Sequence, residues 1–222
     1  MNEFELPPTR KGQHFETVAR RLREFAGLRR DDARLDPFAL AKLAQVLVVE
    51  FDKIDGLSAE TRAHLLGQGA MDWSGGAAAR FLPDGRKLVI LNPGHSPLRH
   101  RATLMEEICH AMLGHKANRL AVQVTTPEGE TRSRDYNQDD EEEAYGVGAA
   151  ALVPFTALKR MTGQGKTARE MARHFEVSRQ LIIFRLKISF LWAEYKERHP
   201  EEARAHRDGR VNAETMRDQD AV

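Results

Sequence analysis

Glu106, Glu107 and His110 form the spacing with the clearest chemical meaning in this sequence. They fall in the stretch 97–115, which has no Pro or Gly between Pro97 and Gly114 and whose apolar residues recur at helical spacing, so the pattern predicts a helix. On a helix, side chains four positions apart share a face, so Glu106 and His110 project together and Glu107 reaches the edge of that face. Two metal ligands at i and i+4 with a carboxylate at i+1 are typical of the zinc-protease helix. There the carboxylate takes a proton from water that the metal has acidified.

The third protein ligand of such a site usually comes from a later helix, and the acidic run 139–143 offers a candidate. Small residues dominate the segment from this run to Leu152, which predicts a closely packed helix that stops at Pro154. The spacing does not distinguish between Glu141, Glu142 and Glu143 as the ligand.

Several further motifs occur in a fixed order along the chain. They are Asp36-Pro37 with Leu40-Ala41, Trp73-Ser74-Gly75, Pro83-Asp84-Gly85, Leu91-Asn92-Pro93, Arg101-Ala102-Thr103-Leu104 followed by Glu107, His110 and Gly114-His115, and Glu141-Glu142-Glu143-Ala144 followed by Leu152-Val153-Pro154. In this order the chain resembles the ImmA/IrrE family of metallopeptidases, from about Asp36 to about Tyr195. The central stretch is similar to the family pattern R-x-T-L-x-H-E-x-x-H-x-x-L-H, and the acidic stretch to E-x-E-A.

The resemblance implies roles for individual residues. It makes Glu107 the general base, His110 a metal ligand and Glu143 the ligand from the second helix, with Glu141 or Glu142 as alternatives. The sequence departs from the family at the first ligand, because Glu106 stands where the family has a histidine.

The departure leaves two interpretations. A carboxylate oxygen is an accepted zinc ligand, so Glu106, His110 and Glu143 could hold Zn²⁺, the ion that the resemblance implies; the added negative charge would also suit Mn²⁺ or Fe²⁺. Alternatively, the fold has lost its metal, and its clustered carboxylates would raise one another's pKa. His95, in the loop before the motif helix, could supply the missing imidazole, although a loop histidine at the surface is the more common case.

The helices and strands that the sequence predicts around these residues indicate an α+β fold. The resemblance implies that this fold is zincin-like, with a small antiparallel-rich sheet and the motif helices. The sequence predicts helices over 14–28, from Asp36, and from Ser58 to Leu66. It predicts a strand at 46–49, a β-meander over 70–92 and a second hairpin over 121–136.

The segment 167–191 has the pattern of a helix-turn-helix, with Ser178 as the N-cap of its second helix. That helix is too apolar to present a polar face to DNA, so we expect it to be buried against the peptidase core. The resulting organisation is an N-terminal helical extension (1–30), a zincin-like metallopeptidase domain (31–160), a helix-turn-helix-like segment packed on it (161–195) and a polar, disordered tail (196–222).

Composition excludes several classes of protein. The 222 residues include 34 Lys and Arg against 33 Asp and Glu, a net charge of +1 that argues against binding mainly through phosphates. The single cysteine excludes an intrachain disulfide framework and favours a reducing cytoplasm. No apolar run reaches the roughly 18 residues of a membrane span, and the first residues lack the apolar core of a secretory signal.

The resemblance implies a metal-dependent endopeptidase that cuts a helix-turn-helix transcriptional repressor in a stress response or in the control of a mobile element. It also implies that the strand near Leu88 to Leu91, as a sheet edge, holds the substrate by β-augmentation. One alternative is a degenerate, non-proteolytic regulator that binds a repressor or a ligand. A second is a DNA-binding regulator acting through residues 167–191. The sequence does not indicate the substrate, the inducing signal or an oligomeric state.

Overall fold

The structure, a computed structural model, describes residues 5–71, 73–78, 80–115 and 137–207. Ten α-helices, one short 3₁₀ helix and three strands are found in this part of the chain. In order they are α1 (Arg10–Phe25), α2 (Pro37–Leu43), β1 (Val46–Val49), η1 (Phe51–Lys53), α3 (Ala59–Leu66), β2 (Gly75–Ala77), β3 (Lys87–Leu91), α4 (Pro97–Leu113), α5 (Gln138–Leu152), α6 (Phe155–Gly163), α7 (Ala168–Phe175), α8 (Arg179–Ile188), α9 (Trp192–Arg198) and α10 (Pro200–Arg207). The predicted α+β class is confirmed. The predicted hairpin over 121–136 lies outside the described residues.

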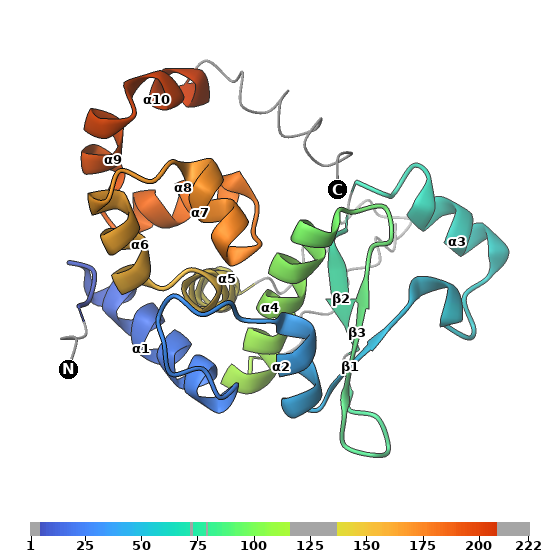
Figure 1. The fold of residues 1–222 in the computed structure, drawn as a ribbon. Helices are drawn as coiled ribbons and strands as arrows, with labels where there is room; N and C mark the ends of the chain where they lie inside the picture. The colour runs from blue at the N-terminus through green and yellow to red at the C-terminus, as the bar shows by residue number, and fades with distance from the viewer. Residues whose placement is uncertain (1–4, 72, 79, 116–136, 208–222) are drawn as a thin grey trace, which may run out of the picture.

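Helix α4 lies between the sheet and helix α5, and this arrangement places the motif helix at the centre of the molecule (Figure 1). Helix α1 packs along α5, and the C-terminal helices α6–α10 follow on the far side of α5 from the sheet. Among the described helices, none combines the length and apolar character that crossing a membrane requires.

Local side-chain caps start the helices where the sequence predicts them. Asp36 Oδ1 accepts a hydrogen bond from the Phe38 N–H at 3.0 Å, with Pro37 as the first helical residue of α2. Ser58 and Ser178 cap α3 and α8 in the same way. A cap satisfies amide groups that have no partner within the helix, which is why these starts can be predicted from the sequence alone.

The sheet has the order β1-β3-β2, with β1 parallel and β2 antiparallel to β3. Leu88 pairs with Leu47 on one side, and Leu91 with Gly75 on the other. Strand β3 is therefore the central strand, and the expectation that 88–91 forms an edge able to hold a substrate is wrong. Within the described residues the sheet is mixed rather than antiparallel-rich.

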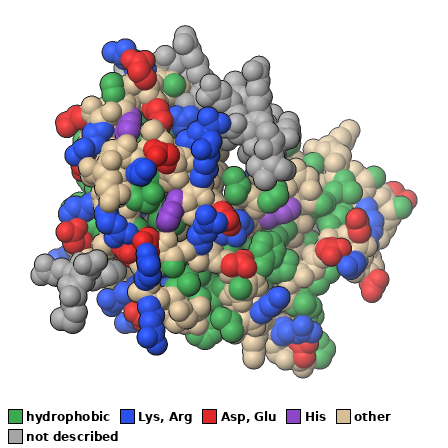
Figure 2. All heavy atoms as spheres, in the orientation of Figure 1, with side chains coloured by type: hydrophobic (Ala, Val, Ile, Leu, Met, Phe, Trp, Pro, Cys, Tyr) green, Lys and Arg blue, Asp and Glu red, His purple; other side chains and the backbone are tan. Residues whose placement is uncertain are grey.

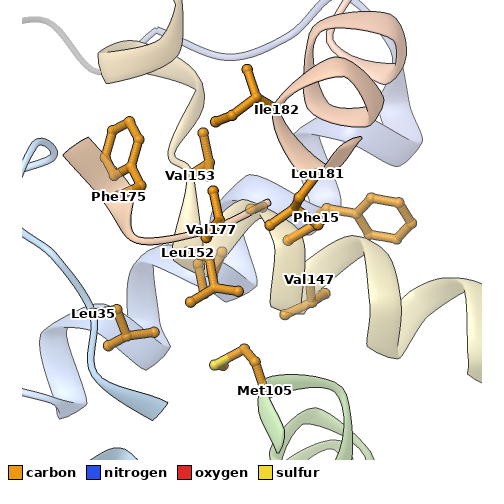
Figure 3. Close-up of a cluster of buried hydrophobic side chains, with 14 of the residues drawn as sticks. Phe15, Leu35, Met105, Val147, Leu152, Val153, Phe175, Val177, Leu181 and Ile182 are labelled. Atoms are coloured by element: carbon orange, nitrogen blue, oxygen red, sulfur yellow. The ribbon is translucent and has the colours of Figure 1, made fainter. Parts of the chain in front are cut away.

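The hydrophobic core joins α4 and α5 to the C-terminal helices. Met105 on α4 points toward Val147 and Leu152 of α5, and Leu181 and Ile182 of α8 reach the same region from the other side (Figure 3). All five side chains are buried. Burial of each large apolar side chain contributes about 1.5–3 kcal/mol relative to exposure, so α4 and α5 are held in a fixed relation.

Helix α8, the second helix of the helix-turn-helix-like segment, is buried as its apolar sequence predicts. Leu181, Ile182, Ile183 and Leu186 are buried, and so is Arg185, which forms an ion pair with Glu16 of α1. On the face seen in Figure 2, Lys and Arg side chains over the C-terminal helices are interspersed with Asp and Glu. Neither feature favours a DNA-reading surface.

One prediction for the C-terminal segment is wrong. Beyond helix α8, Phe190 has a φ of 63° and separates α8 from α9. A disordered tail was expected from residue 196, but α10 covers Pro200–Arg207. This helix is held by polar contacts, because Glu202 accepts hydrogen bonds from Tyr195 Oη at 2.5 Å and from Arg179 at 3.2 Å. Residues 208–222 lie outside the described part.

Candidate metal centre

Glu106 and His110 of α4 and Glu141 of α5 form the one group in the described part of the chain whose side chains could hold a metal ion. One ligand atom from each lies within 4.8 Å of the others. His110 Nε2 and Glu141 Oε2 lie 3.5 Å apart. The predicted helix spacing thus places Glu106 and His110 on a common face, and α5 brings a carboxylate to that face.

The ends of α4 are set by residues that the sequence shows plainly. Ser96 caps its N-terminus and Pro97 is its first residue. Gly114 has a φ of 74°, in the left-handed region that glycine adopts without strain, and ends the helix. The chain then turns back, so that the His115 N–H donates to the His110 carbonyl at 3.0 Å.

Burial dominates the electrostatics of the two glutamates on α4. Burial, together with the negative charges of Glu107 and Glu141, raises the pKa of Glu106 to about 7. Burial and Glu141 likewise raise the pKa of Glu107 to about 7, while Lys87 acts in the opposite direction. For His110, burial lowers the pKa and Glu141 opposes this effect. The site therefore disfavours three ionised carboxylates together, unless a proton or a cation compensates their charge.

Glu107, the predicted general base, lies beside this group rather than in it. Its pKa responds to Glu141, so the two carboxyls are neighbours, and it also responds to Lys87 at the start of β3. A carboxyl with a pKa of about 7 can take up and release a proton near neutral pH, which general acid–base catalysis requires.

Glu143, the expected ligand from α5, is placed elsewhere. Its Oε1 lies 2.5 Å from His14 Nε2 on α1, and its Oε2 lies 3.1 Å from His115 Nε2. Side chains two positions apart on a helix differ by about 200° in direction around the helix axis, so Glu141 and Glu143 face nearly opposite sides of α5. The structure brings Glu141 to Glu106 and His110, whereas Glu142 pairs with Lys11 of α1.

His95, the other predicted candidate, is not part of the group of possible ligands. Both of its ring nitrogens are buried, and neither has a hydrogen-bond partner within the described residues. Burial lowers its pKa, and the positive neighbours Arg99 and His100 lower it further. Its charged neighbours are thus basic, unlike those of Glu106.

The donor set fits a divalent cation. Two carboxylates and one imidazole are accepted zinc ligands, and three protein ligands are typical of catalytic rather than structural zinc sites. The oxygen-rich composition also suits manganese or iron. The Cys109 thiol is no part of the set, because it is buried and its pKa is raised by burial.

His14 is the residue near the site that sequence reasoning missed. It lies on α1, 83 residues before Pro97 at the start of the motif helix, and it contacts the site through Glu143. Its sequence neighbourhood is that of an ordinary amphipathic helix, so no local signal identifies it.

Similarity to known proteins identifies the family of this chain. Residues 63–187, more than half of the chain, match the Peptidase_M78 family, described as the IrrE N-terminal-like domain. A solved structure, a Mycobacterium tuberculosis transcriptional regulator, is similar to this chain with a TM-score of 0.48 and 15% identity; the match covers 78% of this chain and 47% of that one. The chain thus spans about half the length of that protein. No curated protein matches. The matched segment contains Glu106, Glu107, His110 and Glu141, and the chain belongs to the Peptidase_M78 family of IrrE N-terminal-like domains.

Proposed function

We propose that this protein is a metal-dependent endopeptidase of the ImmA/IrrE type. The observation that carries the proposal is the convergence of Glu106, His110 and Glu141 within 4.8 Å, with Glu107 adjacent on the same helix. Membership of a peptidase family supports the reaction class. We further propose that the substrate is a helix-turn-helix transcriptional repressor, because the resemblance to ImmA/IrrE proteins implies one.

Each residue has a defined task in this proposal. Glu106, His110 and Glu141 hold a divalent ion, with zinc as the expected metal. When bound, such an ion supplies Lewis acidity that lowers the pKa of water and polarises a carbonyl group. Glu107 accepts the proton of the attacking water and passes it to the leaving amine, for which a pKa of about 7 is well suited. The ligand residues are half-buried, which reduces the screening of the carboxylates by water and strengthens their interaction with a cation.

The glutamate at position 106 favours a second candidate, a regulator that binds its partner without cutting it. Two carboxylates and one imidazole place more negative charge on the ion than two histidines and one carboxylate would. More ligand charge makes the ion a weaker Lewis acid, so the site could retain metal and lose hydrolysis.

One experiment separates the two candidates. The purified protein, loaded with zinc or manganese, is incubated with a library of peptides derived from a proteome, and cleavage is read by mass spectrometry. Metal content is measured in parallel by elemental analysis. A peptidase predicts about one metal ion per chain, cleavage by the parent protein, and loss of cleavage with retained metal in Glu107→Gln.

Glu142→Gln is the matched control, because Glu142 neighbours the proposed ligand on α5 but pairs with Lys11. It should leave both metal content and cleavage unchanged, whereas Glu141→Gln should lose metal. Metal binding without any cleavage would favour the non-proteolytic regulator. Absence of metal binding would contradict both the proposed ligand set and the enzyme.

A further inference from the structure

A continuous chain of side chains leads from the surface of α1 to the proposed metal ligand His110. His14 Nε2 lies 2.5 Å from Glu143 Oε1, and Glu143 Oε2 lies 3.1 Å from His115 Nε2. His115 Nδ1 in turn lies 3.1 Å from His110 Nδ1. The two imidazole rings of His110 and His115 meet edge to face, with centroids 5.1 Å apart.

The hydrogen positions in this chain follow from donor and acceptor rules. A metal-binding histidine is neutral, and a neutral imidazole has one donor and one acceptor nitrogen. His110 Nε2 faces Glu141, so this nitrogen is the ligand atom and Nδ1 carries the proton. His115 Nδ1 must then accept that proton, which leaves its Nε2 as the donor to Glu143. An ionised Glu143 only accepts, so His14 Nε2 donates to its second oxygen.

Every contact from His110 Nδ1 to His14 then joins one donor to one acceptor. His110 Nε2 and Glu141 Oε2, 3.5 Å apart, face each other without a hydrogen between them, which is where a cation would lie. The opposite assignment, with the proton on His110 Nε2, leaves His110 Nδ1 as an acceptor. His115 Nδ1 would then have to donate, and a neutral His115 could present only an acceptor nitrogen to the acceptor Glu143. When His115 is neutral, the contacts at His110 Nδ1 and at Glu143 therefore favour the Nδ1–H tautomer of His110.

We propose that His115, Glu143 and His14 form a positioning relay that holds His110 in its Nδ1–H tautomer and directs Nε2 toward the ion. The proposal rests on the proposed function, because it assigns these residues to a metal ligand. Metal-bound histidines commonly donate their second ring N–H to a carboxylate, and such partners fix the ring orientation. Here an intervening imidazole, His115, connects the ligand to its carboxylate.

His115, the middle residue of the relay, is held in place by the fold. The His115 side chain is 7% exposed, and Gly114, with a φ of 74°, gives the turn that brings it back over His110. Glu143 comes from α5 and His14 from α1, so three separate elements converge on the ligand. Helix α1, which lies outside the matched family segment, thereby acts on the metal site.

A neighbouring contact provides a matched control. The ion pair of Lys11 and Glu142 also joins α1 to α5. Glu142 directly precedes Glu143 on α5, but the contact to His115 comes from Glu143. Glu142→Gln and Glu143→Gln each remove one negative charge from the same helix surface. Only the second removes a member of the relay.

The test uses the full-length protein and two measurements. In the metal-free protein, ¹⁵N NMR of the histidine rings identifies the tautomer of His110. We expect Nδ1–H in the parent protein and in Glu142→Gln, and a shift toward Nε2–H in His115→Phe. In the second measurement, zinc affinity is determined by competition with a chelator. His115→Phe and Glu143→Gln should weaken binding by about 10- to 100-fold, the usual effect of losing such a partner.

His115→Gln serves as the conservative variant, because an amide can both accept from His110 and donate to Glu143. It should recover part of the zinc affinity that His115→Phe loses. An Nε2–H tautomer of His110 in the parent protein would overturn the relay, as would equal zinc affinities for Glu142→Gln and Glu143→Gln. The tautomer measurement needs no metal and no substrate, so its result is distinct from failure of the proposed peptidase function.

Discussion

Phe15 of α1 and Gly146 of α5 lie so close together that a Cβ atom at position 146 would overlap the aromatic ring. The sequence around Gly146 is rich in small residues, and this contact explains the need for glycine at one of them. Phe15 is buried, and its helix also carries His14 and Glu16, which contact Glu143 and Arg185. The distance between α1 and α5 therefore matters for both the core and the site.

Gly146→Ala should destabilise the protein. The new methyl group must displace the Phe15 ring or the whole of α1, and overpacking of this kind costs about 1–3 kcal/mol. Urea unfolding followed by circular dichroism measures the change in the free energy of unfolding.

Gly163→Ala is the control, because a Cβ there meets no atom within 4 Å. Its free energy of unfolding should stay within about 1 kcal/mol of the parent value or rise, since Ala is favoured over Gly in a helix. Equal stability of the two variants would contradict the packing argument.

The ion pair of Glu16 and Arg185 should be costly to break from one side only. The two side chains are 3% and 2% exposed, so removing either leaves a buried charge without its partner, at a cost of about 3–5 kcal/mol. Glu16→Leu and Arg185→Met are the two variants, and urea unfolding again measures the effect.

The double variant tests what the pair contributes beyond charge. Glu16 also accepts a hydrogen bond from the Phe155 N–H at 3.1 Å, and Arg185 donates to the Val153 carbonyl at 3.0 Å. The double variant should therefore regain part of the lost stability but not all of it, because each orphaned backbone group costs about 1–3 kcal/mol. Simple addition of the two single effects would show that the residues do not interact.

The features that the sequence predicted correctly depend on residues close together in the chain. Asp36 and Ser58 cap the helices that follow them, because each cap needs only its own neighbours in the chain. The pairing of Glu106 with His110 depends only on helix geometry, and the structure reproduces it.

The features that were not predicted depend on contacts between distant segments. Strand β3 was expected at an edge, although its uninterrupted apolar run Leu88 to Leu91 is typical of a strand covered on both sides. Helix α10 is held by Glu202, whose partners Tyr195 and Arg179 lie on other helices.

The choice between Glu141 and Glu143 could not be made from the sequence, because it requires the rotation of α5 about its axis. An amphipathic helix reveals its rotation through an apolar stripe. Helix α5 is buried on nearly all sides, from Ala144 through Gly146 to Leu152, so no stripe exists. Only the packing against α1 and α4 determines which acidic side chain faces His110.

The metal-free protein should become less stable as the pH rises from about 4.5 to 7. In the folded protein Glu106 and Glu107 have a pKa of about 7, against 4.5 for an ordinary glutamate. Between these values the folded state keeps protons that the unfolded state has released, so the free energy of unfolding falls with rising pH and levels off above 7. The loss has an upper limit of roughly 3 kcal/mol per carboxyl, since one pH unit of separation corresponds to about 1.4 kcal/mol.

The comparison that isolates this effect is Glu106→Gln/Glu107→Gln against the parent protein, both in the presence of a chelator. Urea unfolding between pH 5 and 8 should show a smaller slope for the double variant, and the variant should be the more stable protein at pH 8. Parallel pH profiles would contradict the assigned pKa values. Added zinc should reverse the trend in the parent protein, because metal binding competes with protons and strengthens as the pH rises.

Glu106→His should shift the metal preference of the site toward zinc. The exchange replaces an anionic oxygen with a neutral imidazole nitrogen and gives two histidines and one carboxylate, a common set in zinc peptidases. Carboxylate ligands suit manganese, whereas imidazole suits zinc. The measurement is the ratio of the dissociation constants for Mn²⁺ and Zn²⁺, which we expect to rise by about tenfold or more, since 1.4 kcal/mol corresponds to a factor of ten. A weaker ligand charge also leaves the ion a stronger Lewis acid, so peptide cleavage by the zinc-loaded variant should increase. Because α4 holds position 106 on the same face as His110, the new imidazole starts from a suitable place on the helix.

An unchanged ratio of the dissociation constants for Mn²⁺ and Zn²⁺ would mean that the side chain at position 106 is not a ligand. The cation would then have to be held by His110 and Glu141 without it.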